Sequence, residues 1–333
     1  MNSIARIFLR RPSTFLPPCL FLCLLFQVIA PAQVPSAATA DDSREEKIRV
    51  NTNVISLRVS VTDARGKFIP SLEQAAFHVY EDKIPQEISY FSAQDTPASI
   101  CVVFDLSGSM TGEKVMRARE ALRRFIQTSH QDDEYSLVGF NQQAEVLLEN
   151  TCDSDRLLSR LTGLRPKGDT ALYDAVMLGL AQLAHGKWTK RALIVLSDGE
   201  DNSSRATFRQ IRRAVQEADV TIYGVLIQDM LMTRFGASVM QDLALVSGGQ
   251  AYTPDNPEQM SEIFEKIALE LRQQYSIGYT PTSFVADGKW RKLKVLVTLP
   301  PETVYAGGRV IVGARQGYFA VPEKSGSGDQ TAN

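Results

Sequence analysis

The middle of the chain alternates two patterns of hydrophobic residues. Short, almost fully apolar runs at 100–104, 192–196 and 221–227 predict buried strands. Between them, apolar residues recur at helical spacing, and the first such set is Val115, Ala118, Leu122 and Phe125. Strands that alternate with helices predict an α/β fold built on a doubly wound, mostly parallel sheet.

Two further strands predict one exception to the parallel arrangement. The runs 135–140 and 144–148 are separated by only three polar residues, which is a hairpin-sized loop. Because a hairpin joins antiparallel strands, we expect one edge strand of the sheet to run against the others.

Both flanks of this region have the alternating pattern of half-buried strands. The clearest stretches are 55–61, 275–279 and 293–299. Small isolated sheets are marginal in water, so we expect the strands of 48–96 and those of 274–320 to pair into one β-sandwich. The α/β domain, 97–273, is then an insertion in that sandwich.

The N-terminus has the features of a secretory signal peptide. Basic residues precede an apolar stretch over 15–30, and Ala30-Pro31-Ala32 provides a small-x-small cleavage site. Two prolines leave the stretch short of the roughly 20 apolar residues that span a bilayer. We therefore favour a cleaved leader (1–32) over an uncleaved anchor, with a flexible linker (33–47) behind it and no transmembrane span after cleavage. The protein is expected to be exported, either periplasmic or extracellular.

Composition excludes one class of partner. The 333 residues are 44% hydrophobic and carry a net charge of −2. No basic stripe is interleaved with aromatic residues, so a nucleic-acid surface is not expected. We expect Cys101 to be a buried free thiol, leave the redox state of Cys152 open, and expect a disordered tail over 321–333.

Oxygen-bearing side chains gather where predicted strands end. Asp105, Ser107 and Ser109 follow the apolar run 100–104, Thr170 opens a helical pattern, and Asp198 follows another apolar run. The carboxyl ends of parallel strands meet at one edge of a sheet, where ligands bind. Carboxylates and hydroxyls suit a hard divalent cation such as Mg²⁺. The sequence therefore predicts a metal site at this edge.

These five residues resemble the metal-ion-dependent adhesion site of the von Willebrand factor A domain family, which has the pattern Asp-x-Ser-x-Ser, then Thr, then Asp. The resemblance implies a Rossmann-like fold. It also implies that Ser107, Ser109 and Thr170 bind the metal directly, whereas Asp105 and Asp198 bind it directly or through water.

The resemblance covers about 97–273, with one departure. Asp169 precedes the threonine, where many family members have glycine; the added charge either raises cation affinity or weakens binding of an acidic partner. The strings 77–82 and 316–319 are similar to an exported group of von Willebrand A related proteins described in acidobacteria. This second resemblance implies no activity.

The resemblance implies binding rather than catalysis. We expect an adhesion or scaffold module in which Mg²⁺, or alternatively Mn²⁺ or Ca²⁺, is bridged to a Glu or Asp carboxylate of a protein partner. Two alternatives stay open: a structural component of a cell-envelope assembly with a non-essential metal site, and a metal-dependent hydrolase. The hydrolase is less favoured because no general base is evident near the site and the histidines are scattered.

Overall fold

The computed structural model describes residues 54–110, 112–198, 200–227, 234–299 and 310–321. The predicted leader and linker therefore lie outside the described residues, as does nearly all of the predicted C-terminal tail. Within the described part, no helix combines the length and the apolar character needed to cross a membrane.

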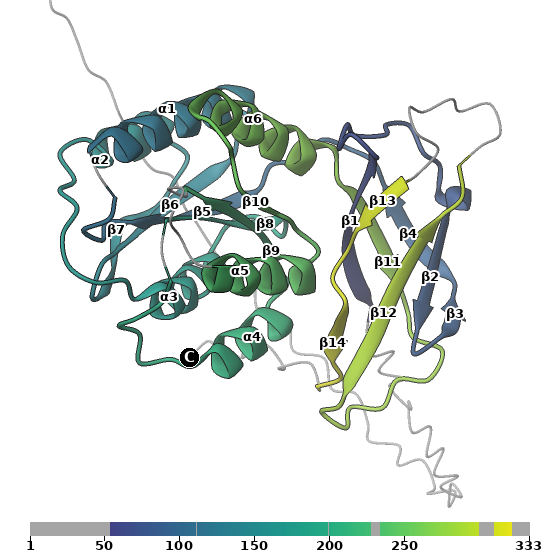
Figure 1. Ribbon diagram of the computed structural model, residues 1–333. Coiled ribbons are helices and arrows are strands. Elements are labelled where there is room, and N and C mark those ends of the chain that lie inside the picture. The colour runs from purple at the N-terminus through teal and green to yellow at the C-terminus, as the bar shows by residue number, and fades with distance from the viewer. Residues whose placement is uncertain (1–53, 111, 199, 228–233, 300–309, 322–333) are drawn as a thin grey trace, which may run out of the picture. The chain divides into compact units, whose positions relative to one another are not determined.

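The central sheet has the strand order β10-β9-β8-β5-β6-β7 (Figure 1). Its strands are β5 (Ser99–Asp105), β6 (Glu134–Phe140), β7 (Ala144–Thr151), β8 (Arg191–Ser197), β9 (Thr221–Leu226) and β10 (Ala251–Tyr252). Neighbouring strands run parallel, except that β7 is antiparallel to β6. The predicted fold class, an α/β fold with a mostly parallel sheet and one antiparallel edge strand, is confirmed.

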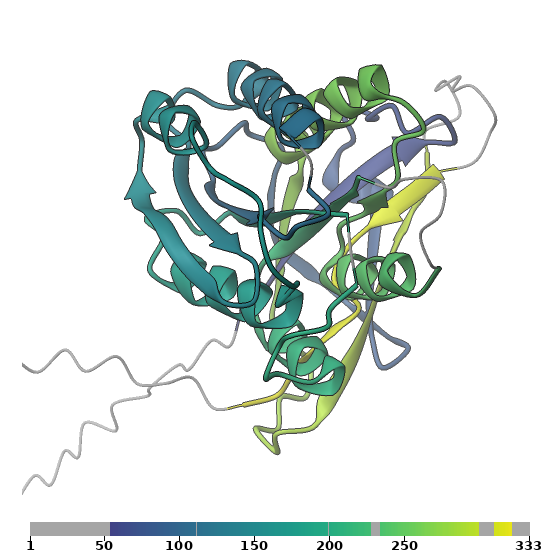
Figure 2. The same ribbon diagram turned by 60° about the vertical axis from the view of Figure 1, so that its left-hand side comes forward.

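Helices cover both faces of this sheet (Figures 1 and 2). One face carries α1 (Gly112–Thr128), α2 (Ser154–Arg160) and α6 (Pro257–Gln273), and the other carries α3 (Leu172–Ala184), α4 (Phe208–Glu217) and α5 (Arg234–Ser247). Side chains alternate between the faces along each strand. In β5, Val102 and Phe104 therefore join the core beneath α1 and α6, whereas Cys101 and Val103 join the core beneath α3 and α5.

Local sequence explains where several helices begin. Thr207 and Gln210 form a reciprocal capping box at the start of α4. The Asn256 side chain accepts a hydrogen bond from the backbone N–H of Gln259, and Pro257 occupies the first helical position of α6. These caps satisfy backbone donors that have no partner within the helix.

The strands on either side of the α/β domain form two four-stranded sheets, ordered β13-β1-β11-β4 and β14-β12-β2-β3. The N-terminal strands are β1 (Ile55–Asp63), β2 (Phe77–Glu81), β3 (Ile84–Gln86) and β4 (Ile88–Ser92), and a 3-10 turn, Gln74–Ala76, precedes β2. The C-terminal strands are β11 (Tyr275–Tyr279), β12 (Trp290–Val297), β13 (Val310–Gly313) and β14 (Gly317–Phe319). Each sheet therefore mixes strands from both flanks, as the sandwich prediction requires.

One apolar core lies between these two sheets. It includes Leu57 of β1 and Val79 of β2, together with the aromatic ring of Tyr275, which contacts Phe77 and Phe91 at centroid distances of 4.9 and 5.8 Å. Aromatic rings bury a large apolar area each, so this cluster stabilises the pairing of early and late strands.

The two cysteines of the described chain are free thiols. Cys101 is fully buried in β5, and burial raises the pKa of its thiol to about 12. A thiol with such a pKa is unreactive at neutral pH. Cys101 is therefore a core residue, as predicted, whereas Cys152 is exposed.

Candidate functional site

The candidate site lies where β5 and β8 end at the same edge of the sheet. Asp105 is the last residue of β5, and Ser197 is the last residue of β8, so Asp198 comes directly after that strand. These two parallel strands are neighbours in the sheet. Their carboxyl ends therefore place both carboxylates on one edge, where they are almost completely buried: Asp105 is 0% exposed and Asp198 2%.

Hydrogen bonds connect four of the five residues predicted from the sequence. The backbone N–H of Ser107 donates to Asp105 Oδ1 at 2.8 Å, and the hydroxyls of Ser107 and Ser109 are 3.0 Å apart. Ser109 Oγ donates to Asp198 Oδ1 at 2.7 Å. The first loop is thus tied to the end of β8 through side chains rather than through backbone groups.

Backbone contacts bring the loop of Thr170 to the other two loops. The N–H of Gly108 donates to the carbonyl of Gly168 at 2.9 Å, and the N–H of Thr170 donates to Asn202 Oδ1 at 2.9 Å. Gly168 has a φ of +81°, a conformation that favours glycine. Thr170 is buried, whereas Asp169 beside it is exposed. The structure therefore assembles all five predicted residues from three mutually bonded loops.

Burial dominates the electrostatics of Asp105. It raises the pKa of this carboxyl, and the nearby charge of Asp198 raises it further. Hydrogen bonds from Ser107 and Ser197 act in the opposite direction, and Ser197 Oγ donates to Asp105 Oδ2 at 2.6 Å. The cost of burying the charge of Asp105 favours a nearby cation.

Two residues at the site were not predicted from the sequence. Ser197 orients Asp105, and Lys114 reaches in from α1, where its Nζ lies 2.5 Å from Asp198 Oδ2 and 3.1 Å from the carbonyl oxygen of Ser109. Lys114 is the third residue of α1. A cation in the first turn of a helix is disfavoured by the helix dipole, so this placement was a usable signal that the lysine has another partner.

The donor set fits a hard cation. Its oxygens come from two carboxylates and three hydroxyls, which are ligands that Mg²⁺ accepts. Among the described residues, no group of three or more His, Cys, Asp or Glu side chains is placed to hold a metal, so this donor set depends on its hydroxyl oxygens. Two positions beyond Asp198, Glu200 Oε1 is buried and has no hydrogen-bond partner within the described part. An orphaned carboxylate oxygen in this loop adds to the attraction for a cation.

The other acidic side chains near this edge support the backbone. Asp201 Oδ1 accepts a hydrogen bond from the N–H of Tyr173, at the start of α3. Asp174 accepts from the backbone N–H groups of Arg205 and Ala206, each at 3.0 Å. These carboxylates therefore fasten α3 to the loop that follows β8.

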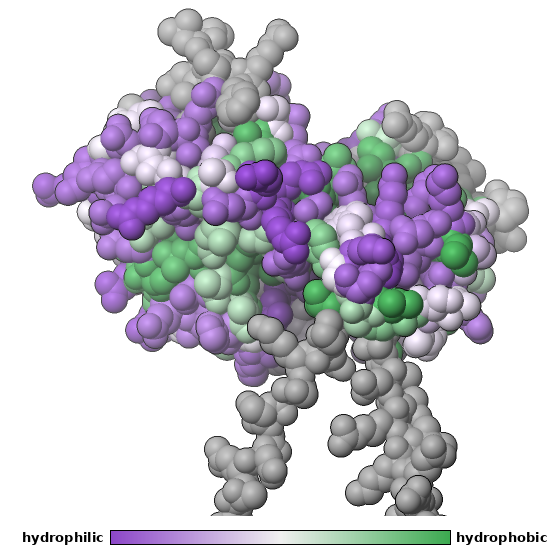
Figure 3. All heavy atoms as spheres, turned by 90° about the horizontal axis from the view of Figure 1, so that it is seen from below, coloured by the Kyte–Doolittle hydropathy of each residue, from purple (hydrophilic) through white to green (hydrophobic). Residues whose placement is uncertain are grey.

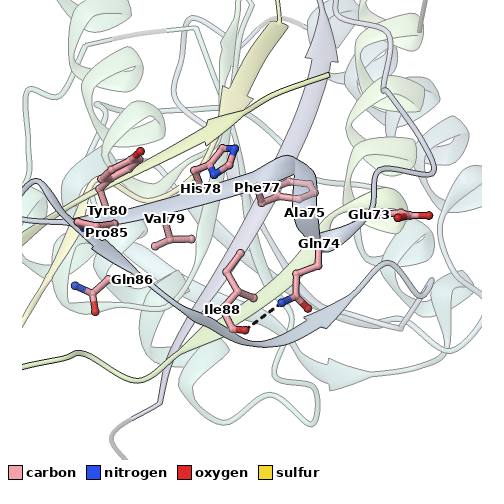
Figure 4. A pocket seen from close by; sticks show the side chains of 10 residues that line it. All are labelled: Glu73, Gln74, Ala75, Phe77, His78, Val79, Tyr80, Pro85, Gln86 and Ile88. Atoms are coloured by element: carbon pink, nitrogen blue, oxygen red, sulfur yellow. Dashed lines mark hydrogen bonds between the residues drawn. The ribbon is translucent and has the colours of Figure 1, made fainter. Parts of the chain in front are cut away.

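A hollow of about 590 Å³ lies on the sandwich rather than at this edge (Figure 4). Glu73 and His78, two of its lining residues, lie apart and do not point toward each other in Figure 4. His78 Nε2 is 3.2 Å from Thr298 Oγ1, and Gln74 donates to the carbonyl of Ile88. The polar groups of a binding or catalytic site converge on one point, and the groups that line this hollow do not.

The surface seen in Figure 3 carries hydrophobic residues in separate areas among hydrophilic ones. The large apolar side chains that are exposed in the described chain come from different elements, among them Met116 of α1, Leu245 of α5 and Tyr90 of β4. Scattered apolar residues of this kind are usual on a protein surface. The converging polar groups at the ends of β5 and β8 therefore remain the best candidate site.

Comparison with known proteins identifies the domain that carries this site. Residues 100–200, which include Asp105, Thr170 and Asp198, match the family model described as von Willebrand factor type A domain. The chain carries a von Willebrand factor type A domain. The sequence-based prediction of this domain is confirmed, whereas the metal site and the likeness to the acidobacterial group stay predictions.

Two curated relatives match this chain over part of their own length. An uncharacterized protein of Synechocystis sp. is 22% identical over 188 residues, which are 55% of this chain and 43% of that protein. Inter-alpha-trypsin inhibitor heavy chain H4 of Homo sapiens is 23% identical over 232 residues, or 63% of this chain and 24% of that protein. The chain thus spans less than half the length of these curated relatives.

Among solved structures, a von Willebrand factor type A protein from Catenulispora acidiphila matches with a TM-score of 0.46 and 14% sequence identity. The match covers 82% of this chain and 75% of that chain. The von Willebrand factor domain of the pilus tip protein Mfa5 from Porphyromonas gingivalis matches over 53% of this chain and 95% of that chain, with a TM-score of 0.44 and 14% identity.

Proposed function

We propose that this protein is an exported, divalent-cation-dependent binding module whose von Willebrand A domain holds Mg²⁺ and captures an acidic side chain of a protein partner. The observation that carries the proposal is the convergence of two buried carboxylates, Asp105 and Asp198, with the hydroxyls of Ser107 and Ser109 on the edge where β5 and β8 end. Mn²⁺ and Ca²⁺ are further candidates for the same oxygens.

The ligand set explains why a partner carboxylate would bind. Ser107, Ser109 and Thr170 would contribute neutral hydroxyl oxygens, and Asp105 and Asp198 would contribute negative charge directly or through water. A bound divalent ion would supply a Lewis acid that attracts a Glu or Asp carboxylate. Because three of the five ligands are neutral hydroxyls, the ion would stay electrophilic toward that partner carboxylate.

Neither histidine of the α/β domain is placed to act as a general base at the site. A metal-dependent hydrolase uses a general base within hydrogen-bond reach of the reacting water. His185 follows the last residue of α3, a 13-residue helix whose first turn lies beside the site. Such a helix is about 20 Å long, so His185 is at its far end. His130 lies between α1 and β6, at the edge of the sheet where β6 begins.

Calorimetric titration tests the metal site. The exported form of the protein, stripped with a chelator, is titrated with Mg²⁺ and Mn²⁺ beside the Asp105→Ala variant. We expect saturable binding that is lost in the variant, because a buried carboxylate of the site is removed. Asp169→Ala is the matched control: it removes the same charge from a neighbouring but exposed position and should still bind metal. Equal metal affinity in wild type and Asp105→Ala would refute the proposal.

A capture experiment tests the partner. Envelope proteins are passed over the immobilised protein with Mg²⁺ or with chelator, and bound proteins are identified. We expect a partner that is retained with Mg²⁺, released by chelator and not retained by Asp105→Ala. Retention that is insensitive to chelator would instead support the structural-component alternative.

A further inference from the structure

Lys114 is a buried cation placed against the candidate metal ligands. Its side chain is 9% exposed and that of Asp198 is 0% exposed. The ammonium contacts Asp198 Oδ2 at 2.5 Å and the carbonyl oxygen of Ser109 at 3.1 Å. A buried ammonium is stable only when it is paired in this way. The lysine therefore belongs to the electrostatics of the site and not to the solvent-exposed surface of α1.

With Lys114 in place, both oxygens of Asp198 are bonded by donors of the chain itself. Ser109 Oγ donates to Oδ1 and Lys114 Nζ donates to Oδ2. The hydroxyl of Ser109 is in turn 3.0 Å from that of Ser107. The network is thus satisfied by protein groups, and one of the two buried carboxylates is already neutralised by a protein cation.

We propose that Lys114 is an internal counter-ion that opposes divalent cations at this site and stabilises the site when no metal is bound. The inference rests on the proposed function, since Lys114 can oppose a metal only at a site that binds one. Two cations repel strongly when little water separates them, so a divalent ion near Asp198 weakens the Lys114–Asp198 pair. The flexible four-carbon stem of a lysine allows the ammonium to withdraw. Metal affinity would then be set partly by this residue.

The test compares wild type with Lys114→Met, which keeps the length and volume of the stem and removes the charge. Calorimetry with Mg²⁺ should show tighter binding in the variant by ~10-fold, which corresponds to about 1.4 kcal/mol. In chelator, the melting temperature of the variant should be lower than that of wild type, because Asp198 is left buried without its counter-ion. Mg²⁺ should therefore raise the melting temperature of the variant more than that of wild type.

Arg124→Met is the matched control. Arg124 is exposed on the same helix, so this variant loses the same charge without touching the site. We expect its Mg²⁺ affinity and its metal-free melting temperature to equal those of wild type. If Lys114→Met fails to fold, Lys114→Gln serves in its place, because the amide keeps a hydrogen-bond donor for Asp198 but carries no charge.

The outcomes separate this inference from the proposed function. Unchanged or weaker Mg²⁺ binding in the lysine variant would overturn the inference while wild-type binding leaves the proposed function standing. Binding by the variant alone would support the inference and overturn the proposed function of the unaltered chain. An absence of binding in both proteins would overturn both.

Discussion

The central sheet has buried charged side chains both where its strands end and where they begin, and the two groups differ in role. At the edge where the strands end, Asp198 pairs with Lys114 and with the hydroxyl of Ser109. At the edge where they begin, Asp133 accepts hydrogen bonds from two backbone N–H groups, at 2.7 and 3.1 Å, and Lys190 donates to two backbone carbonyls, at 2.6 and 3.0 Å.

The charged residues where the strands begin support the backbone, whereas those where the strands end form the candidate site. Backbone groups that lose a buried partner have no substitute, so Asp133 and Lys190 act as permanent clamps on the chain. At the other edge the partners are mostly side chains, and a metal ion can replace a lysine as the partner of a carboxylate. Burial and charge alone therefore do not distinguish function from structure in this domain; the identity of the hydrogen-bond partners does.

We expect the largest effect at the edge where the strands begin, which holds Asp133 and Lys190 and is called the clamp edge. Lys190→Met leaves the carbonyl oxygens of Thr96 and Leu271 without a buried donor. We expect a loss of roughly 3 kcal/mol in the free energy of unfolding, since each unsatisfied buried group costs about 1–3 kcal/mol. Urea denaturation measures the loss, and calorimetry on the folded variant should give the wild-type Mg²⁺ affinity. A changed affinity would mean that the two edges are not independent.

Mg²⁺ should stabilise the protein only through the candidate site, at the edge where β5 and β8 end. At a free Mg²⁺ concentration 100 times the dissociation constant, a ligand that binds only the folded state adds about 2.7 kcal/mol of stability. We expect this increase in wild type and in Asp169→Ala, and none in Asp105→Ala. Urea denaturation with Mg²⁺ or chelator measures it. Stabilisation of Asp105→Ala would place the cation elsewhere.

The stability of the protein should also depend on pH, through Asp133 at the clamp edge. Burial raises the pKa of Asp133 from 3.8 to about 6, although hydrogen bonds from Ala98 and His130 and the charge of Lys190 oppose the shift. Between pH 4 and 6 the unfolded chain has lost this proton while the folded chain still holds it. Stability should therefore fall as pH rises through this window, by on the order of 2 kcal/mol. The difference between wild type and Asp133→Asn, measured by denaturation at several pH values, should follow this slope, and a constant difference would contradict it.

The smallest effect concerns Ser197, which orients Asp105. Ser197→Ala removes the hydrogen bond to Asp105 Oδ2. We expect a loss of about 1 kcal/mol in stability, typical of one buried hydrogen bond, and a weaker Mg²⁺ affinity of about threefold. A complete loss of metal binding would instead identify Ser197 as a ligand. Ser204→Ala, at a serine whose hydroxyl accepts from the N–H of Asp174, is a control in the same region.

The sequence was informative about the fold because three strands of the central sheet correspond to the nearly wholly apolar runs 100–104, 192–196 and 221–227. Asp105 and Asp198 could be placed at one edge because both directly follow apolar runs in an alternating chain. Lys114 was missed because its partner is 84 positions away, and no local pattern encodes that distance. Its unfavourable place in the first turn of α1 was the only local signal.

Strand β3 was also missed, for a reason of turn chemistry. It follows β2 after Asp82 and Lys83, which both adopt positive φ, at 46° and 73°. A two-residue hairpin of this type is recognised in sequence by Asn-Gly or Asp-Gly, and here a lysine takes the position where glycine is preferred. Tertiary pairing with β2 overrides that local preference.

Each of the two outer sheets combines strands from before and after the α/β domain, and this has a consequence for folding during synthesis on the ribosome. Leu57 of β1 pairs with Ile277 of β11, some 220 positions later, whereas the partners of the central sheet all lie within 99–252. At roughly 5–20 residues per second, β1 leaves the ribosome well before its partners β11 and β13 exist. The inserted domain can close first, and β1 finds its neighbours only afterwards. Until then its open edges are the part of the nascent chain most exposed to wrong partners.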